Sequence, residues 1–122
     1  MSLCLVANWK LNGSREFNLQ WTLDFLRNFN GNNFSSLGIA PASLYIDHLK
    51  ATLADHEIKI GSQNIALEET GACTGEISAS MIKDLGCEFS IVGHSERRML
   101  FHETNQMIGQ KLIQANNNSV IP

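Results

Sequence analysis

Short apolar runs alternate along this chain with longer segments in which apolar residues recur at helical spacing. The runs predict strands, and the segments between them predict helices. The predicted strands lie at residues 3–7, 37–40, 58–61 and 89–92. Residues 3–7 contain no polar side chain except a cysteine thiol, so this first strand is expected to be buried on both faces of a sheet.

Each predicted helix follows a serine or threonine, whose side-chain oxygen is suited to accept a hydrogen bond from the first helical turn. The expected caps are Ser14, Ser43, Ser78, Ser95 and Thr104. The longest helix is predicted over residues 15–29, and the polar segment 30–33 is expected to end it. The helix after Thr104 is expected to bury the apolar face formed by Met107, Ile108, Leu112 and Ala115.

These elements form four βα units, and the apolar pair at 120–121 predicts the start of a fifth. Strands joined by helices are parallel, and the connections are right-handed. Two α/β architectures fit this order: part of a (β/α)₈ barrel, and a small open doubly wound sheet. The spacing of apolar residues does not separate them. The polar segment 63–77 is expected to be a long loop.

The composition is that of a globular protein with 122 residues and a net charge of −3 at pH 7. A single domain is therefore expected, without a cationic surface for nucleic acid or acidic membranes. Cys4, Cys73 and Cys87 show no CxxC spacing, which indicates free thiols and no metal site. No signal peptide or membrane segment is recognisable, so we expect a cytoplasmic protein.

Polar side chains follow the first and fourth predicted strands, where parallel α/β proteins carry their functional groups. Lys10 after the first strand is suited to neutralise an anionic substrate, and Asn8 to hold it in place. His94 after the fourth strand precedes a helical turn, whose dipole favours a neutral imidazole able to donate a proton to a carbonyl oxygen. For both Lys10 and His94 the alternative is a surface residue without a task.

Four segments together closely resemble the triosephosphate isomerase family. They are Asn8-Trp9-Lys10, Gly61-Ser-Gln-Asn64, Thr70 to Ser78 and Ile91-Val-Gly-His-Ser-Glu-Arg-Arg98, in this order along nearly the whole chain. The resemblance implies a TIM barrel that interconverts dihydroxyacetone phosphate and D-glyceraldehyde 3-phosphate through an enediolate. This reaction belongs to glycolysis and gluconeogenesis and uses no metal or organic cofactor.

The resemblance also implies roles for single residues. Asn8 and Lys10 bind the substrate, with Lys10 offsetting its negative charge and contributing to catalysis. His94 is the catalytic electrophile that polarises the carbonyl. Ser95 and Glu96 belong to the supporting polar cluster, with Glu96 next to the lysine.

The family forms homodimers in which the long loop reaches the neighbouring subunit. By resemblance, Thr74 approaches the partner's site, and Glu76 and Arg97 join a polar network at the interface. A long loop without regular structure suits such a role. Self-association is expected through the loop at 64–77 and through open barrel edges.

A barrel of this class has ~250 residues, so residues 1–122 are expected to form a single partial domain. This is the N-terminal half of the barrel, (β/α)₄ plus the start of strand five. The family's catalytic glutamate, lid and phosphate-gripping loops come later, so the chain is expected to be inactive alone. The alternatives are a non-catalytic half-barrel that only folds or self-associates, and a small phosphate-binding domain.

Overall fold

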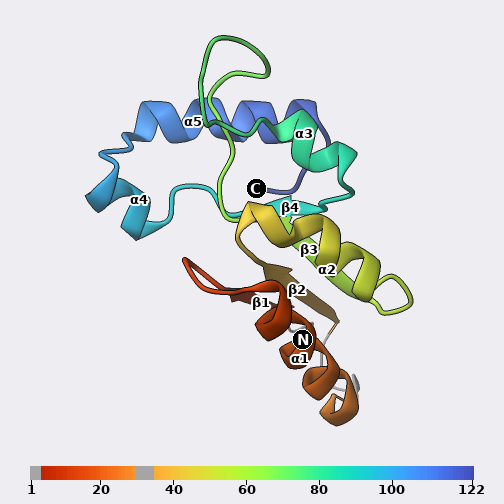
Figure 1. The fold of residues 1–122 in the computed structure, drawn as a ribbon. Helices are drawn as coiled ribbons and strands as arrows, with labels where there is room; N and C mark the ends of the chain where they lie inside the picture. Colours follow the sequence, from red (N-terminus) through yellow and green to blue (C-terminus); the bar gives the residue numbers. More distant parts are fainter. Residues whose placement is uncertain (1–3, 30–34) are drawn as a thin grey trace.

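The computed structural model describes residues 4–29 and 35–122, which include one four-stranded parallel sheet (Figure 1). The strands are β1 (Cys4–Asn8), β2 (Ser36–Ala40), β3 (Ile58–Ser62) and β4 (Phe89–Ser90). Their order in the sheet is β1-β2-β3-β4, the same as in the sequence. A doubly wound sheet reverses its strand order at a switch point. The sequential order is that of a half-barrel and excludes the doubly wound alternative.

The start of a further strand is confirmed beside β4. Ile121 forms a parallel bridge with Phe89, supported by a bond from the Ser90 amide to the Ile121 carbonyl at 2.9 Å. β4 itself is shorter than the predicted run at 89–92, because regular pairing with β3 is limited to Phe89 and Ser90.

The helices follow the predicted alternation with the strands. They are α1 (Arg15–Asn28), α2 (Ile46–Thr52) after the 3₁₀ turn η1 (Ser43–Tyr45), α3 (Ala79–Asp84), α4 (Ser95–Leu100) and α5 (Asn105–Asn117). The caps Ser14, Ser78 and Thr104 are confirmed, since each side-chain oxygen accepts the amide three residues later at 3.1–3.2 Å. The predicted stop at 30–33 lies outside the described residues. None of the helices described here is long and apolar enough to cross a membrane.

The predicted cap at Ser43 is wrong. Ser43 lies inside η1, and α2 starts after Tyr45 without a side-chain cap. The Tyr45 amide instead donates to the carbonyl of Ala42 at 2.9 Å. This amide, which could have donated to a capping side chain, therefore already donates to a backbone carbonyl.

The expected burial of the first strand on both faces is also wrong. Leu5 is 47% exposed and Val6 44%. The described sheet places β1 at its edge, with β2 as its hydrogen-bonded neighbour on one side. An apolar run is buried only where other elements cover it, and this edge is open in the single chain.

The hydrophobic core lies between β2, β3 and the helices. Ile39 and Ile60 are paired across the sheet, and both are at most 1% exposed. Ile46 and Leu49 of α2 join the same cluster with no exposed surface. Full burial of such a side chain stabilises the fold by about 1.5–3 kcal/mol. The core therefore fixes β2 and β3, whose C-terminal ends lead into the polar region described below.

Phe89 of β4 lies against Gly61 of the adjacent strand β3 and against Gly38 of β2, one strand further. A Cβ atom on Gly61 would be 2.5 Å from the Phe89 ring, and one on Gly38 would be 2.8 Å from it. Real Cβ contacts are essentially never so short. The ring lies across the backbone of β2 and β3 because neither strand has a side chain at these positions.

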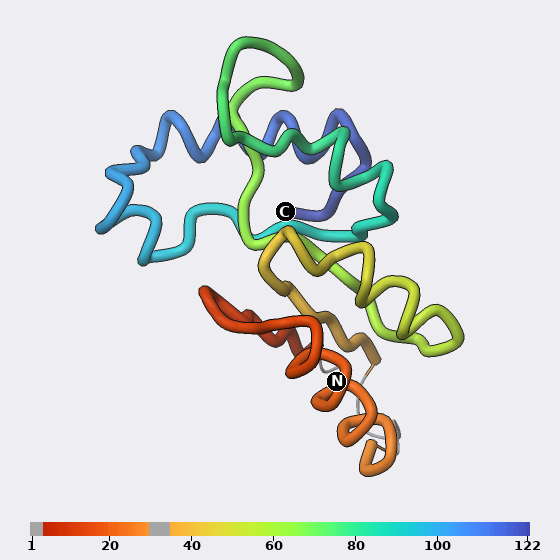
Figure 2. Tube along the Cα trace, viewed as in Figure 1, coloured from red at the N-terminus to blue at the C-terminus, as the bar shows by residue number. Residues whose placement is uncertain are grey.

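The segment between β3 and α3 is a long loop, as predicted. It stands away from the sheet in Figure 2, and the Ala66 amide closes its base by donating to the Ile77 carbonyl at 2.8 Å. Gly71 and Gly75 have φ values of +142° and +90°, in the region that favours glycine. Open space surrounds both glycines.

Candidate active site

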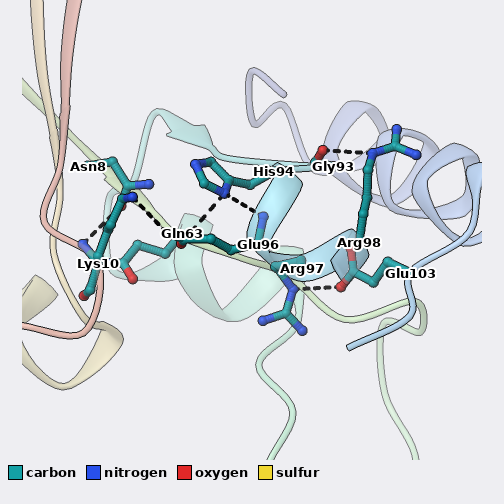
Figure 3. Close-up of polar contacts among 9 residues, drawn as sticks. All are labelled: Asn8, Lys10, Gln63, Gly93, His94, Glu96, Arg97, Arg98 and Glu103. Carbon is teal, nitrogen blue, oxygen red and sulfur yellow. Dashed lines mark hydrogen bonds and ion pairs between the residues drawn. The ribbon is translucent and has the colours of Figure 1, made fainter. Parts of the chain in front are cut away.

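The C-terminal ends of β1, β3 and β4 meet at one pocket of about 510 Å³. Asn8, Lys10, His94 and Glu96 all line it, so the structure brings together most of the predicted site residues (Figure 3). The first two residues are more than 80 positions from the last two in sequence, and the contact between Lys10 and Glu96 spans 86. Parallel strands bring such distant segments to the same edge of the sheet.

The backbone at Lys10 adopts a left-handed conformation with φ of +54°. Such a conformation costs a non-glycine residue about 1–2 kcal/mol. Its amide donates to Asn8 Oδ1 at 3.0 Å, and its carbonyl accepts from Gln63 Nε2 at 2.9 Å. The same Gln63 nitrogen also contacts the carbonyl of Ala40 at 2.9 Å. Side chains on both sides therefore hold Lys10 in this strained conformation, a pattern that is common at functional sites.

Lys10 and Glu96 form an ion pair at the mouth of the pocket. Lys10 Nζ lies 2.6 Å from Glu96 Oε1, and the side chains are 51% and 42% exposed. The hydrogen bond from Lys10 holds the pKa of Glu96 below its ordinary value, and the charge of Lys10 acts in the same direction. Partial burial opposes this effect without reversing it. The Glu96 carboxylate thus lies near both the ammonium of Lys10 and the imidazole of His94.

His94 caps α4 with its own side chain, which corrects the expectation that Ser95 would do so. The backbone amide of Glu96 donates to His94 Nδ1 at 3.1 Å. An accepting Nδ1 carries no proton, so the proton of the neutral ring is on Nε2. The Glu96 carboxylate is 3.6 Å from Nδ1, outside hydrogen-bond range. This geometry leaves Nε2 as the ring nitrogen that is able to donate.

Ser95 occupies the first position of α4 and is exposed. No side-chain hydrogen bond of Ser95 is found within residues 4–29 and 35–122, and Ser95 does not line the pocket. Of the predicted polar cluster, the structure therefore brings Glu96 into contact with the site and leaves Ser95 outside it.

A buried ionic cluster lies behind the pocket. Glu103 is 6% exposed, and its Oε1 accepts from Arg97 Nε at 2.6 Å and from Lys111 Nζ. Lys111 is 3% exposed and also donates to Asn64 Oδ1 at 2.7 Å. Burial by itself would raise the pKa of Glu103, but the bonds and charges of Lys111 and Arg97 hold this pKa below its ordinary value.

Of the residues predicted at an interface, two lie on the long loop and Arg97 lies on α4. Thr74 and Glu76 are exposed, and Glu76 borders the pocket. The Arg97 side chain is 25% exposed and stacks on the Phe101 ring, 4.5 Å from its centre. Within the described part of this single chain, Arg97 pairs with Glu103, and no ion pair joins it to Glu76.

Sequence reasoning missed Gln63 and Lys111 as parts of the site region. Gln63 directly follows β3. Gln63 follows the C-terminal end of its strand, as Asn8 ends the first strand, and functional groups gather at this edge of a parallel sheet. This position was a signal that could have identified Gln63. Lys111 gave no such signal, because a lysine in the middle of a helix usually faces water.

Comparison with known proteins agrees with the fold. The family model described as triosephosphate isomerase matches residues 3–122. Triosephosphate isomerase of Nitrosococcus oceani is 39% identical over 118 residues, which are 97% of this chain and 47% of that protein. The enzyme of Baumannia cicadellinicola is 41% identical over 120 residues, covering 97% and 46%, and that of Salmonella newport 40% over 107, covering 88% and 42%. The chain spans about half the length of these curated relatives.

Proposed function

Because this chain belongs to the triosephosphate isomerase family, we propose that it supplies the substrate-binding and carbonyl-polarising half of an isomerase site. The observation that carries the proposal is the convergence of Lys10 and His94 on one pocket, with the Nε2–H of His94 available as a donor. The substrate pair is dihydroxyacetone phosphate and D-glyceraldehyde 3-phosphate. The place of action is the cytoplasm.

Each group has a defined task in this reaction. Lys10 and Asn8 bind the substrate. The positive charge of Lys10 offsets the negative charges of the phosphate and of the developing enediolate. His94 donates from Nε2 to the carbonyl oxygen while a base removes the proton from the neighbouring carbon. A neutral histidine with a glutamate base is the known arrangement of this family.

Residues 1–122 alone are proposed to be without isomerase activity. In the family, the glutamate base and the loops that grip the phosphate come from later segments, and none of the glutamates here stands in a matching context. A positioned base contributes about 10²–10⁴ in rate, and a lost phosphate grip weakens positioning further.

A first experiment uses the 122-residue chain. Dihydroxyacetone phosphate is titrated while NMR follows the backbone amides of Lys10 and His94, and isomerisation is assayed in parallel. We expect weak binding that disappears in Lys10→Ala, without turnover. Turnover above the Lys10→Ala control would show that residues 1–122 are active alone.

A second experiment places these residues in a complete site. Residues 1–122 replace the aligned segment of the Nitrosococcus oceani relative. The chimera is expected to isomerise the substrate, and His94→Gln is expected to lower kcat by about 10²–10³-fold, as for other lost oxyanion donors. An active chimera that is indifferent to both Lys10→Ala and His94→Gln would refute the assigned roles.

Association of two chains is part of the proposal. In the family's dimer the loop at 64–77 reaches the partner, with Thr74 near the partner's site and Glu76 and Arg97 in a polar network. The exposed position of Thr74 on a projecting loop supports this arrangement. Light scattering of the chain and of the Thr74→Arg variant tests this. The variant should have a lower average mass, closer to that of the monomer.

A non-catalytic half-barrel that only self-associates is the second candidate. The exposed Leu5 and Val6 on the open edge of β1 favour it, since such edges pair with other chains. Here Val6→Lys should weaken association more than Thr74→Arg does. Substrate-dependent shifts at His94 would speak against this candidate as the whole function.

A further inference from the structure

Lys111 is a buried cation in the middle of α5 (Asn105–Asn117), which lies alongside the loop after β3 in Figure 1. Its Nζ donates to Asn64 Oδ1, 47 residues away in sequence, and to Glu103 Oε1 on the segment before α5. Only 3% of Lys111 is exposed. One ammonium group therefore joins two separate segments of the chain behind the pocket.

The first segment leads to Lys10. Asn64 directly follows Gln63, whose side chain holds the carbonyls of Lys10 and Ala40 at 2.9 Å each. Fixing the Asn64 side chain from behind restrains the backbone from which Gln63 reaches forward. The left-handed conformation of Lys10 therefore depends on a segment that Lys111 holds.

The second segment leads to His94 and Glu96. Glu103 accepts from Arg97 at 2.6 Å, and Arg97 belongs to the short helix α4. The first turn of α4 contains Glu96, and its cap is His94. Fixing Glu103 thus orients the helix that carries the other half of the site.

Stability alone does not account for a charge at position 111. Burying an ammonium and a carboxylate costs several kcal/mol per ion, and apolar replacements of buried ion sets are often neutral or stabilising. Hydrogen bonds to an ammonium differ from apolar packing because they hold each acceptor oxygen within a short distance of the charge. Lys111 contacts acceptors on both segments, so it sets their separation.

We propose that Lys111 is a positioning residue that holds Lys10 in register with Glu96 and His94 through Asn64 on one side and Glu103 on the other. This proposal rests on the proposed function for the use of the site. The geometry itself is measurable without substrate. Lys111 is 3% exposed and contacts the pocket only through these neighbours.

The test is the titration of Glu96 by carboxyl NMR in the 122-residue chain and in Lys111→Met. Glu96 is faced by Lys10 from the segment after β1 and by His94 from the start of α4. Its pKa is held low chiefly by the bond from Lys10. If Lys111 sets their register, the pKa of Glu96 rises toward its ordinary value in Lys111→Met. A change in global stability alone leaves this pKa where it is.

A matched control and a second variant complete the test. Lys83→Met makes the same change on α3, where Lys83 donates to the Ser119 carbonyl at 3.0 Å, and should leave the pKa of Glu96 unchanged. Asn64→Ala breaks one contact of Lys111 and retains its ion pair, so it serves if Lys111→Met does not fold. A low, unchanged pKa of Glu96 in folded Lys111→Met, or in Asn64→Ala, overturns the proposal.

The outcome is separable from that of the proposed function. An inactive chimera would refute the isomerase assignment and leave the Glu96 titration unaffected. In an active chimera, Asn64→Ala should raise KM and lower kcat together, since it displaces Lys10 relative to His94.

Discussion

Between β2, β3 and α2 the buried side chains are aliphatic, whereas behind the pocket they are charged. Ile39 and Ile60 are held by the apolar area they share with α2. Glu103 and Lys111 are also buried but are held by mutual charge and hydrogen bonds. Apolar contact is non-directional and is lost in proportion to the atoms removed. A charge cluster depends on every partner, so one substitution leaves the others buried without compensation.

The largest effect is expected from Glu103→Gln. It removes the anion between Arg97 and Lys111 and leaves the buried ammonium without a counter-charge. The free energy of unfolding should fall by about 3–5 kcal/mol, as for other broken buried pairs. Urea unfolding measures this, with the exposed Glu57→Gln as the control. A loss no larger than that of the control would remove the contrast between the two regions.

Acid should weaken the charged region first. The pKa of Glu103 in the folded chain is below its ordinary value of 4.5. The unfolded chain therefore binds this proton first as the pH falls. The stabilisation from Glu103 is present above pH 4.5 and is lost as the pH falls from there through the lower folded pKa. Unfolding free energies across this range should show a smaller pH slope in Glu103→Gln.

Ile39→Val is expected to have a smaller, graded effect on the aliphatic region. It removes one methyl group from a side chain that is 1% exposed. Such changes cost about 0.5–1.5 kcal/mol. Urea unfolding again measures the difference, and its slope with denaturant should not change. A cost equal to that of Glu103→Gln would show that both regions fail in the same way.

The smallest stability change is expected at Lys10, which belongs to neither region. Glycine tolerates φ of +54°, so Lys10→Gly relieves strain and should raise the melting temperature slightly or leave it unchanged. Substrate-dependent NMR shifts should nevertheless disappear. A clear loss of stability would mean that Lys10 has a structural role.

Local signals in the sequence predicted local structure well. Ser14, Ser78 and Thr104 cap helices because the cap and its amide are three residues apart. The exposure of Leu5 could not be read in this way, since burial of a strand depends on what lies beside it. The sequence predicted where the strands lie along the chain. Their order in the sheet, which follows the chain without reversal, required the structure.

Position along the chain predicted which residues would lie together at the pocket. Lys10 and His94 follow strands, and parallel strands gather such residues at one edge. The helix pattern instead predicted Leu112 inside, yet Leu112 is 38% exposed and Lys111 is buried. The burial of Lys111 depends on Asn64 and Glu103, and apolar spacing contains no information about partners elsewhere in the chain.

The contact of Phe89 with Gly38 and Gly61 has a consequence for how this protein varies in evolution. The aromatic ring at position 89 requires glycine at positions 38 and 61, because a Cβ atom at position 61 would be 2.5 Å from the ring. The three positions therefore constrain one another. Alanine at position 61 is therefore compatible only with a smaller residue at position 89. In relatives, substitutions at these positions should occur together, and a substitution at one position alone should be selected against.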